Sequence, residues 1–285
     1  MSLPLEGVRV IELAQIIAGP YCALQLAHFG AEVIKVEAPG TGEFLRQRPP
    51  APGNVNSGFL MFNAGKKSVT LNLKDARGRD LLMRLLEDAD VMVENYAPGA
   101  LERLGFGYEQ LARRFPRLIY ASCKGYGSDS RWAQLGAMDF TVQAASGIVS
   151  MTGYADRPGV RATAALIDTS TGMHLAAGVM ASLIERGRSG RGRKVEVAML
   201  DITVPAVSGS IAASREGRPA LKRIANRHPS ACPCNTYRTV DGEILIYCLT
   251  EDHWRMFAHV IGRDDLIDDP RFRDHLSRYQ IIDEV

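Results

Sequence analysis

The stretch that decides the fold is VRVIELAQIIAGPYCALQLAHFGAEVIKVE, residues 8–37. Residues 8–13 (VRVIEL) and 32–37 (EVIKVE) are short β-branched runs, which is typical of buried strands. Residues 21–29 (YCALQLAHF) between them have the pattern of a helix that ends at Gly30. A strand, a helix and a second strand at this spacing predict a βαβ unit, whose two strands run parallel.

The same alternation continues along the chain. Further predicted strands are 68–73, 91–96 and 118–123, and further predicted helices are 75–88, 98–115 (broken), 139–149 and 169–186. Residues 194–199 (KVEVAM) fit either a strand or a helix. This alternation predicts the α/β class, with a large domain built on a Rossmann-like, doubly wound parallel sheet.

The character of the sequence changes after about residue 207, where Gly, Pro and basic residues cluster. Two short strands then flank the Asp241-Gly242 turn, and a helix is predicted over 253–261. We therefore expect a large domain over 1–210, a linker over 211–227 and the start of a second, smaller α+β domain over 228–285.

Composition excludes several classes of function. The chain has 285 residues, 46% hydrophobic and 23% charged, and a net charge of +2, which argues against binding nucleic acid. The one basic run, ERGRSGRGRK at 185–194, is predicted to be a solvated turn, although it is compatible with binding a phosphorylated small molecule. No window is apolar enough for a membrane span, so we expect no membrane contact.

Five cysteines and no signal peptide predict free thiols and a cytoplasmic protein. Cys232 and Cys234 form only C-x-C, without a second pair at zinc spacing, so we expect no metal site. The six histidines show no ligand spacing, and His174 is expected to serve packing on its long helix.

The first strand-helix turn, QIIAGP at 15–20, is not G-x-G-x-x-G. Glu37 ends the second strand, where a dinucleotide-binding fold would place its ribose carboxylate, but without the glycines NAD binding is disfavoured. The helix N-terminus in this turn would still suit a phosphate or a carboxylate.

Asp168 is the carboxylate that stands out. It opens the long helix predicted near 169–186, where aspartate is a favoured N-cap. A carboxylate at that position would be held by backbone N–H groups and stay ionised, which also suits a nucleophile. Small neighbours such as Ala164 and Gly172 would leave room for a substrate. The residue pattern leaves both interpretations, helix cap and nucleophile, open.

Seven ordered blocks between residue 5 and about residue 272 resemble the class III CoA-transferases, the family of formyl-CoA transferase, carnitine CoA-transferase and α-methylacyl-CoA racemase. The blocks are LEGVRVIELAQIIAGPYCALQLAHFGAEVIKVEAPG, NAGKKSVTLNLK, VENYAPGALERLGFGYEQL, LIYASCKGYG, MDFTVQAASGIVSMTG, ALIDTSTGMHLAAGVMASL and GRGRKVEVAMLD.

The resemblance implies an acyl-CoA:carboxylate CoA-transferase in which Asp168 is the covalent nucleophile. Its substrates would be an acyl-CoA and a small carboxylic acid, with no tightly bound cofactor. It would move CoA through an aspartyl anhydride and an aspartyl-CoA thioester. Members of the family form interlocked dimers, so we expect a homodimer.

The resemblance also assigns the CoA contacts, with Lys124 as the first candidate for a CoA phosphate and Arg103 as the next. Some relatives carry an arginine at position 38, and the alanine here leaves only a backbone contact. The full set of predicted contacts is Ile17, Ala18, Ala38, Leu71, Asn72, Leu73, Lys74, Asn95, Tyr96, Ala97, Arg103 and Lys124.

Three departures from the family keep alternatives open. Racemases need a histidine just before the aspartate of the M-D-F block, and this chain has Met138, which disfavours an acyl-CoA racemase or isomerase. Residues 224–235 lack the glycine-rich loop of formyl-CoA transferase, which argues against formyl or oxalate substrates. Relatives continue past the position of Val285 with a segment that returns to the large domain, and we expect this chain to lack that segment. A non-catalytic CoA-binding short form is therefore the other alternative.

Overall fold

The computed structural model describes residues 2–48, 56–218 and 222–285, which form two compact units. The first unit contains the residues up to Gly147 together with Ala162–Ile211. The second contains Ile148–Arg161 and Ala212–Val285.

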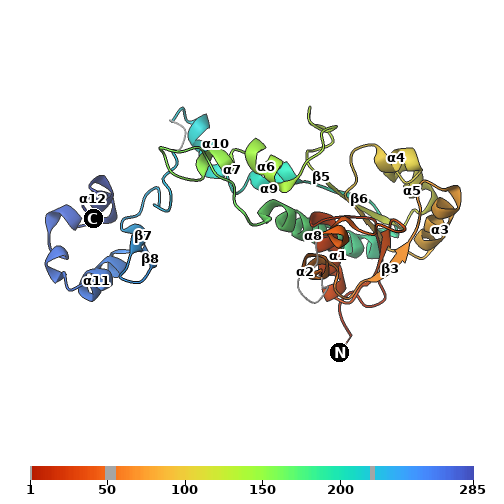
Figure 1. Cartoon of the computed structure of the whole chain (residues 1–285), viewed down its shortest axis with the longest axis horizontal. Helices are drawn as coiled ribbons and strands as arrows, with labels where there is room; N and C mark the ends of the chain where they lie inside the picture. The colour runs from red at the N-terminus through yellow and green to blue at the C-terminus, as the bar shows by residue number, and fades with distance from the viewer. Residues whose placement is uncertain (1, 49–55, 219–221) are drawn as a thin grey trace. The chain divides into compact units, whose positions relative to one another are not determined.

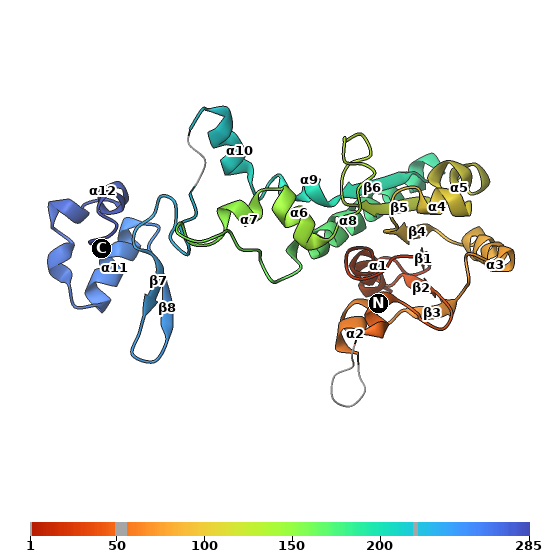
Figure 2. The ribbon, with the colours of Figure 1, turned by 45° about the horizontal axis from the view of Figure 1, so that its top comes forward.

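The first unit is built on a parallel sheet of six strands in the order β3-β2-β1-β4-β5-β6 (Figure 1, with all six strands labelled in Figure 2). The strands are β1 (Arg9–Glu12), β2 (Glu32–Glu37), β3 (Lys67–Thr70), β4 (Val91–Glu94), β5 (Ile119–Lys124) and β6 (Lys194–Ala198). The predicted α/β class and parallel sheet are confirmed. The ambiguous stretch 194–199 is strand β6, whose last residue immediately precedes α9.

Helices cover both faces of this sheet. Successive residues of a strand point to opposite faces, and Met92 and Tyr120 pack with Leu82 of α3 and Leu111 of α5 in one apolar core. On the other face α1 packs against α8, which also contacts β5 and β6 (Figures 1 and 2).

The helices of the first unit begin and end close to their predicted bounds, except that α1 and α8 both start about three residues earlier. They are α1 (Ala18–His28), α2 (Ser57–Asn63), α3 (Ala76–Glu87), α4 (Ala100–Leu104), α5 (Tyr108–Arg114), α6 (Asp139–Ala145), α8 (Leu166–Ser189) and α9 (Met199–Thr203), with a 3-10 turn at Phe44–Gln47. Helices α2 and α9 were not predicted, and α8 ends three residues later than predicted. The predicted helix 139–149 ends at Ala145 because Gly147 adopts a φ of 87°.

The second unit contains the predicted hairpin, β7 (Cys234–Arg238) paired antiparallel with β8 (Glu243–Tyr247). Its other elements are α7 (Ile148–Met151), α11 (Glu251–Val260), α12 (His275–Gln280) and two 3-10 turns at Asp264–Leu266 and Pro270–Phe272. Arg278 is fully buried and organises this unit. Its guanidinium donates two hydrogen bonds of 2.8 and 2.9 Å to Glu251 and lies 4.8 Å from the Trp254 ring centre.

The boundary between the units differs from the predicted one in two respects. Residues 148–161 belong to the second unit, although the prediction placed them in a domain over 1–210. The predicted linker 211–227 begins inside helix α10 (Ser208–Arg215), and its residues 219–221 lie outside the described part of the chain.

A glycine sets the distance between α1 and α8. A Cβ at Gly172 would lie 2.6 Å from the Ala18 carbonyl oxygen and 3.1 Å from the Cys22 nitrogen, so only a bare Cα allows the two backbones to approach this closely. Gly187, on the same helix, has nothing within 4 Å of its Cβ position.

These two glycines give a matched test of the α1–α8 contact. Gly172→Ala should lower the thermal midpoint by about 5 °C, because overpacking against backbone costs roughly 1–3 kcal/mol. Gly187→Ala should raise the midpoint slightly, because replacing Gly by Ala in a helix stabilises the folded state by up to ~1 kcal/mol. Thermal unfolding of both variants checks this, and equal shifts would show that the close approach does not constrain the fold.

Candidate active site

A pocket of about 320 Å³ lies where the strand order reverses, between β1 and β4. In doubly wound sheets this switch point, outside the carboxyl ends of the strands, is where ligands bind. The pocket is lined by residues 15–18, 95–98, 123–125 and 135–138, together with Asp168 and Met199.

Asp168 enters this pocket from the first turn of α8. Gly172 is one turn further along the same face of the helix, so its contact with Ala18 brings Asp168 beside the start of α1. No side chain caps α1 at Ile17. The positive end of the α1 dipole therefore faces the pocket that holds Asp168.

Of the two interpretations that the residue pattern left open for Asp168, the helix cap is wrong. Helix α8 begins at Leu166, and its N-cap residue, Ala165, has no capping side chain. The capping carboxylate is Asp139, whose Oδ2 accepts hydrogen bonds of 2.8 Å from the Ile167 N–H and 3.1 Å from the Asp168 N–H. The Asp168 carboxylate is consequently free for other contacts.

The expectation that Asp168 stays readily ionised is corrected as well. Burial, with a smaller contribution from the charge of Asp139, raises the pKa of Asp168 to about 7. Among the described residues, none donates a hydrogen bond to its carboxylate. Burial and the nearby Asp168 charge also raise the pKa of the pocket-lining Cys123 thiol to about 12, so this thiol stays protonated.

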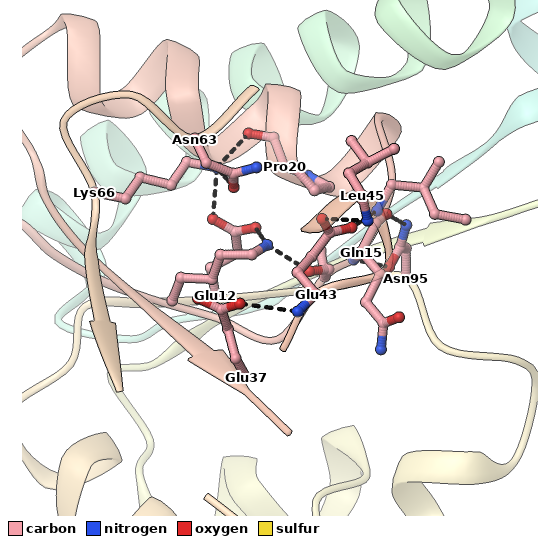
Figure 3. A network of polar contacts seen from close by, with 12 residues as sticks. Glu12, Gln15, Pro20, Glu37, Glu43, Leu45, Asn63, Lys66 and Asn95 are labelled. Atoms are coloured by element: carbon pink, nitrogen blue, oxygen red, sulfur yellow. Dashed lines mark hydrogen bonds and ion pairs between the residues drawn. The ribbon is translucent and has the colours of Figure 1, made fainter. Parts of the chain in front are cut away.

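The loop between β1 and α1 is fixed from two sides (Figure 3). Asn95 accepts a 2.8 Å hydrogen bond from the Gln15 N–H and donates one of 2.7 Å to the Gln15 carbonyl. Glu43, which is buried, accepts from the Ile16 N–H at 2.5 Å. Ile16 has a φ of 69°, which is rare for a β-branched residue, so these contacts stabilise a strained turn at the pocket wall.

A buried ionic cluster lies under the same loop. Glu12 pairs with Lys35 at 2.6 Å and with Lys66 at 2.7 Å, and all three side chains are almost fully buried. The two ammonium groups donate to the Ala14 carbonyl and the Pro20 carbonyl, both at 2.8 Å, which ties down both ends of the loop (Figure 3). Burial lowers the pKa of Lys66 to about 8.

The Glu37 carboxylate is ionised, and its charge is paired within the protein. Its carboxylate accepts hydrogen bonds from Arg46, Ser68 and the Glu43 N–H. Although burial opposes ionisation, the hydrogen bonds from Arg46, Ser68 and Glu43 outweigh it and lower the pKa of Glu37 to about 2. Glu37 therefore fixes the loop that carries Glu43, rather than presenting a free carboxylate to a nucleotide (Figure 3).

The predicted CoA contacts fall largely into two neighbouring pockets. Six lie with Asp168 in the first pocket, and a second pocket of about 170 Å³ lies at the ends of β2 and β3. Gln15 and Tyr96 line both. The first pocket holds Ile17, Ala18, Asn95, Tyr96, Ala97 and Lys124, and the second holds Ala38, Leu71, Asn72, Leu73, Lys74 and again Tyr96.

The basic residues differ in how free their charges are. Lys124 pairs with the buried Glu94 at 2.9 Å and donates a 2.8 Å hydrogen bond to the Tyr96 carbonyl. Arg103 is exposed on α4 and lines neither pocket. Lys74 is exposed at the second pocket, and among the described residues its ammonium group has no ion-pair partner.

Comparison with known proteins decides the family. The model of CoA-transferase family III matches residues 5–285. The chain belongs to this family. The predicted resemblance and the predicted class of enzyme, a family III acyl-CoA:carboxylate CoA-transferase, are confirmed.

Two curated relatives show the range of this CoA-transferase family. The acetyl-CoA:oxalate CoA-transferase of Acetobacter aceti is 37% identical over 96% of this chain and 71% of its own length. The succinyl-CoA:glutarate CoA-transferase of Mus musculus is 35% identical over 97% of this chain and 64% of its own length. The chain thus spans about two thirds of the length of these relatives.

Solved structures agree with the fold. A CAIB/BAIF family protein from Brucella suis superposes with a TM-score of 0.87 at 32% identity, covering 99% of this chain and 75% of that one. The protein Rv3272 from M. tuberculosis gives 0.87 at 35% identity, covering 99% and 76%. In the described part of the chain, no helix has the length and apolar character that crossing a bilayer requires.

Sequence reasoning missed the residues that support the site, namely Glu12, Lys35, Glu43, Lys66 and Asp139. One signal was available for the first two, because Glu12 and Lys35 interrupt apolar strand runs and are register partners across β1 and β2. Charged residues in such runs are paired when buried. His174, expected to serve packing, is exposed, and its Nδ1 lies 2.8 Å from the Ser170 carbonyl.

The raised pKa of Asp168 has a consequence for stability. The folded protein holds the Asp168 proton more tightly than the unfolded chain, so this group lowers stability as pH rises from about 4 to 7. Asp168→Asn should match wild type near pH 4 and be more stable above pH 7 by about 4 kcal/mol, or roughly 10 °C. Thermal midpoints across this pH range measure the difference.

The matched control is Asp80→Asn, which replaces an exposed carboxylate on α3. Its thermal midpoint should follow wild type at every pH. If the thermal midpoints of wild type and Asp168→Asn changed in parallel with pH, Asp168 would have an ordinary pKa.

Proposed function

We propose that this protein moves CoA from an acyl-CoA to a carboxylic acid with Asp168 as the covalent nucleophile. The observation that carries the proposal is the placement of Asp168. It is a partly buried carboxylate without a hydrogen-bond donor among the described residues, in the switch-point pocket beside the start of α1.

In the first half-reaction an Asp168 oxygen attacks the thioester carbon of the donor. A C–O bond forms, the C–S bond breaks, and the electron pair leaves with the CoA thiolate, giving a mixed anhydride. The thiolate then attacks the Asp168 carbonyl carbon, which releases the donor acid as a carboxylate and leaves an aspartyl-CoA thioester. The negative charge of Asp168 has then left the site.

The second half-reaction runs these steps in reverse with the acceptor acid. The acceptor carboxylate attacks the aspartyl-CoA thioester, and the thiolate returns to the acceptor's acyl carbon, which regenerates ionised Asp168. Each tetrahedral intermediate carries an oxyanion. The backbone N–H groups of Ile17 and Ala18, at the positive end of α1, are the donors we assign to it.

The two adjoining pockets suggest how CoA binds. The adenosine end would occupy the pocket near Ala38 and Leu71, and the pantetheine arm would pass Tyr96 to reach Asp168. Lys74 is the better partner for a CoA phosphate, because the Lys124 charge is already paired with Glu94.

The identity of the acceptor is open to direct test. The relatives act on oxalate and glutarate according to their names, so both acids belong in the panel, despite the missing glycine run at 224–235. Met138 lines the pocket where racemases have a histidine base, so proton exchange at Cα is disfavoured. A homodimer, its interlocking and a cytoplasmic location remain predictions from sequence.

Asp168→Ala should abolish transfer, with a loss of at least about 10³-fold, because no other carboxylate among the described residues lines the pocket and could replace the nucleophile. Incubating wild type with succinyl-CoA and a mixture of oxalate, glutarate and acetate, with mass spectrometry of the products, measures the activity. Hydroxylamine added during turnover should convert Asp168 to its hydroxamate.

Asp80→Ala serves as the surface control and should retain the wild-type rate. Transfer by Asp168→Ala at the wild-type rate would contradict the covalent mechanism. CoA binding without exchange across the panel would favour the non-catalytic alternative.

A further inference from the structure

Two side chains of α6 fix the N-terminus of α8 and the segment that leads into it. The chain leaves the first unit after Gly147 and re-enters it at Ala162, six residues before Asp168. Gln143 fixes this return point, because its Oε1 accepts from the Ala162 N–H at 2.9 Å and its Nε2 donates to the Ala162 carbonyl at 3.2 Å.

Asp139 lies one turn before Gln143 on the same face of α6 and continues the clamp. Its Oδ2 accepts from the first N–H groups of α8, and its Oδ1 accepts from the Gln143 Nε2 at 2.5 Å. The Asp139 side chain is 5% exposed and the Gln143 side chain 1%. Helix α6 packs directly on α8 (Figure 2).

A neutral residue could satisfy the same N–H groups, since Asn and Ser cap helices as well as Asp does. An aspartate at this position therefore places a second negative charge, mostly out of water, next to the residue that must react. Like charges brought together in a poorly solvated site disfavour the state in which both are ionised.

The other groups that face Asp168 do not cancel this charge. From β5 comes Cys123, which stays protonated, and Lys124, whose ammonium is paired with Glu94. The loop after β4 contributes Tyr96, and α1 contributes only backbone N–H groups at the pocket. Among the described residues, Asp139 is thus the one whose full charge acts on Asp168, alongside the partial positive charge at the start of α1.

We propose that Asp139 is a positioning residue whose negative charge drives formation of the covalent intermediate on Asp168. This inference rests on the proposed function. When Asp168 becomes an aspartyl-CoA thioester, the reaction Asp168–COO⁻ + RCO–SCoA → Asp168–CO–SCoA + RCOO⁻ removes its charge from the site. The repulsion from Asp139 is relieved, so the covalent state is favoured over the free carboxylate.

Protonation and acylation of Asp168 have the same electrostatic consequence, since each neutralises the carboxylate beside Asp139. Removing the Asp139 charge must therefore weaken both by the same factor. A helix cap without an electrostatic role would alter stability but would leave both equilibria unchanged. This equality separates the two roles of Asp139.

The test compares Asp139→Asn and Asp139→Ser, which keep a capping oxygen, with Asp139→Glu, which restores the charge. Gln143→Leu is the matched control, because it breaks the clamp and leaves the Asp139 charge in place. The titration of Asp168 is measured without substrate. For each variant, the free energy of unfolding is compared with that of the double variant that also carries Asp168→Asn, and the pH dependence of this difference gives the midpoint of Asp168. The equilibrium fraction of aspartyl-CoA enzyme at a fixed ratio of acyl-CoA to free acid is measured by mass spectrometry.

Asp139→Asn and Asp139→Ser should shift the Asp168 midpoint down by about one pH unit and lower the ratio of covalent to free enzyme about tenfold. The pH at which kcat/KM is half-maximal should fall by the same amount. Asp139→Glu should return both quantities toward wild type, and Gln143→Leu should leave the midpoint in place.

An unchanged midpoint in a folded Asn or Ser variant, or a midpoint and a covalent ratio that change by different factors, would overturn the proposal. Failure of the proposed function looks different. No covalent adduct would then form on wild-type Asp168, while the substrate-free titration would still report the coupling between Asp139 and Asp168.

Discussion

The close approach of α8 to the start of α1 is the constraint on which the site depends. Gly172 permits it, and the rigid β1–α1 loop gives α8 a fixed surface to pack against. That rigidity comes from the buried Glu12 with its two lysines and from Glu43 on the Ile16 N–H. Losing one partner of such a cluster would leave a buried charge unpaired, so these residues support the pocket although none of them needs to touch a substrate.

The different roles of Asp139 and Asp168 follow from the same geometry. Asp139 satisfies the first N–H groups of α8, so the Asp168 carboxylate reaches the pocket without a hydrogen-bond donor from any residue that the structure describes. Burial then raises the pKa of Asp168 to about 7, which leaves it ionised often enough to react near neutral pH and basic enough to be a competent nucleophile. A carboxylate held by several N–H groups would be a weaker base and a poorer nucleophile.

The sequence predicted the sheet, because its strands are continuous β-branched runs bounded by turns, and it predicted Asp168 through its block. It did not predict which aspartate caps α8, because Asp139 and the helix it caps are far apart in sequence and meet only through the packing of α6. Lys124 illustrates the same limit. The resemblance assigned it to a CoA phosphate, whereas the pairing of its ammonium group with Glu94 depends on the register of β4 and β5. Likewise, nothing in the sequence of residues 148–161 indicates that they belong to the second unit.

If Asp168 is the nucleophile, one of its oxygens is exchanged with the substrate acids, and isotope transfer detects this exchange. The protein would be turned over with an acyl-CoA and an acceptor acid whose carboxylate carries ¹⁸O, and the mass of the peptide containing Asp168 would then be measured. Acceptor ¹⁸O should appear in the Asp168 carboxylate and, after further turnovers, in the released donor acid. Rapid transfer with an unlabelled Asp168 would contradict this role of Asp168, because CoA would then pass between the acids without a bond to the protein.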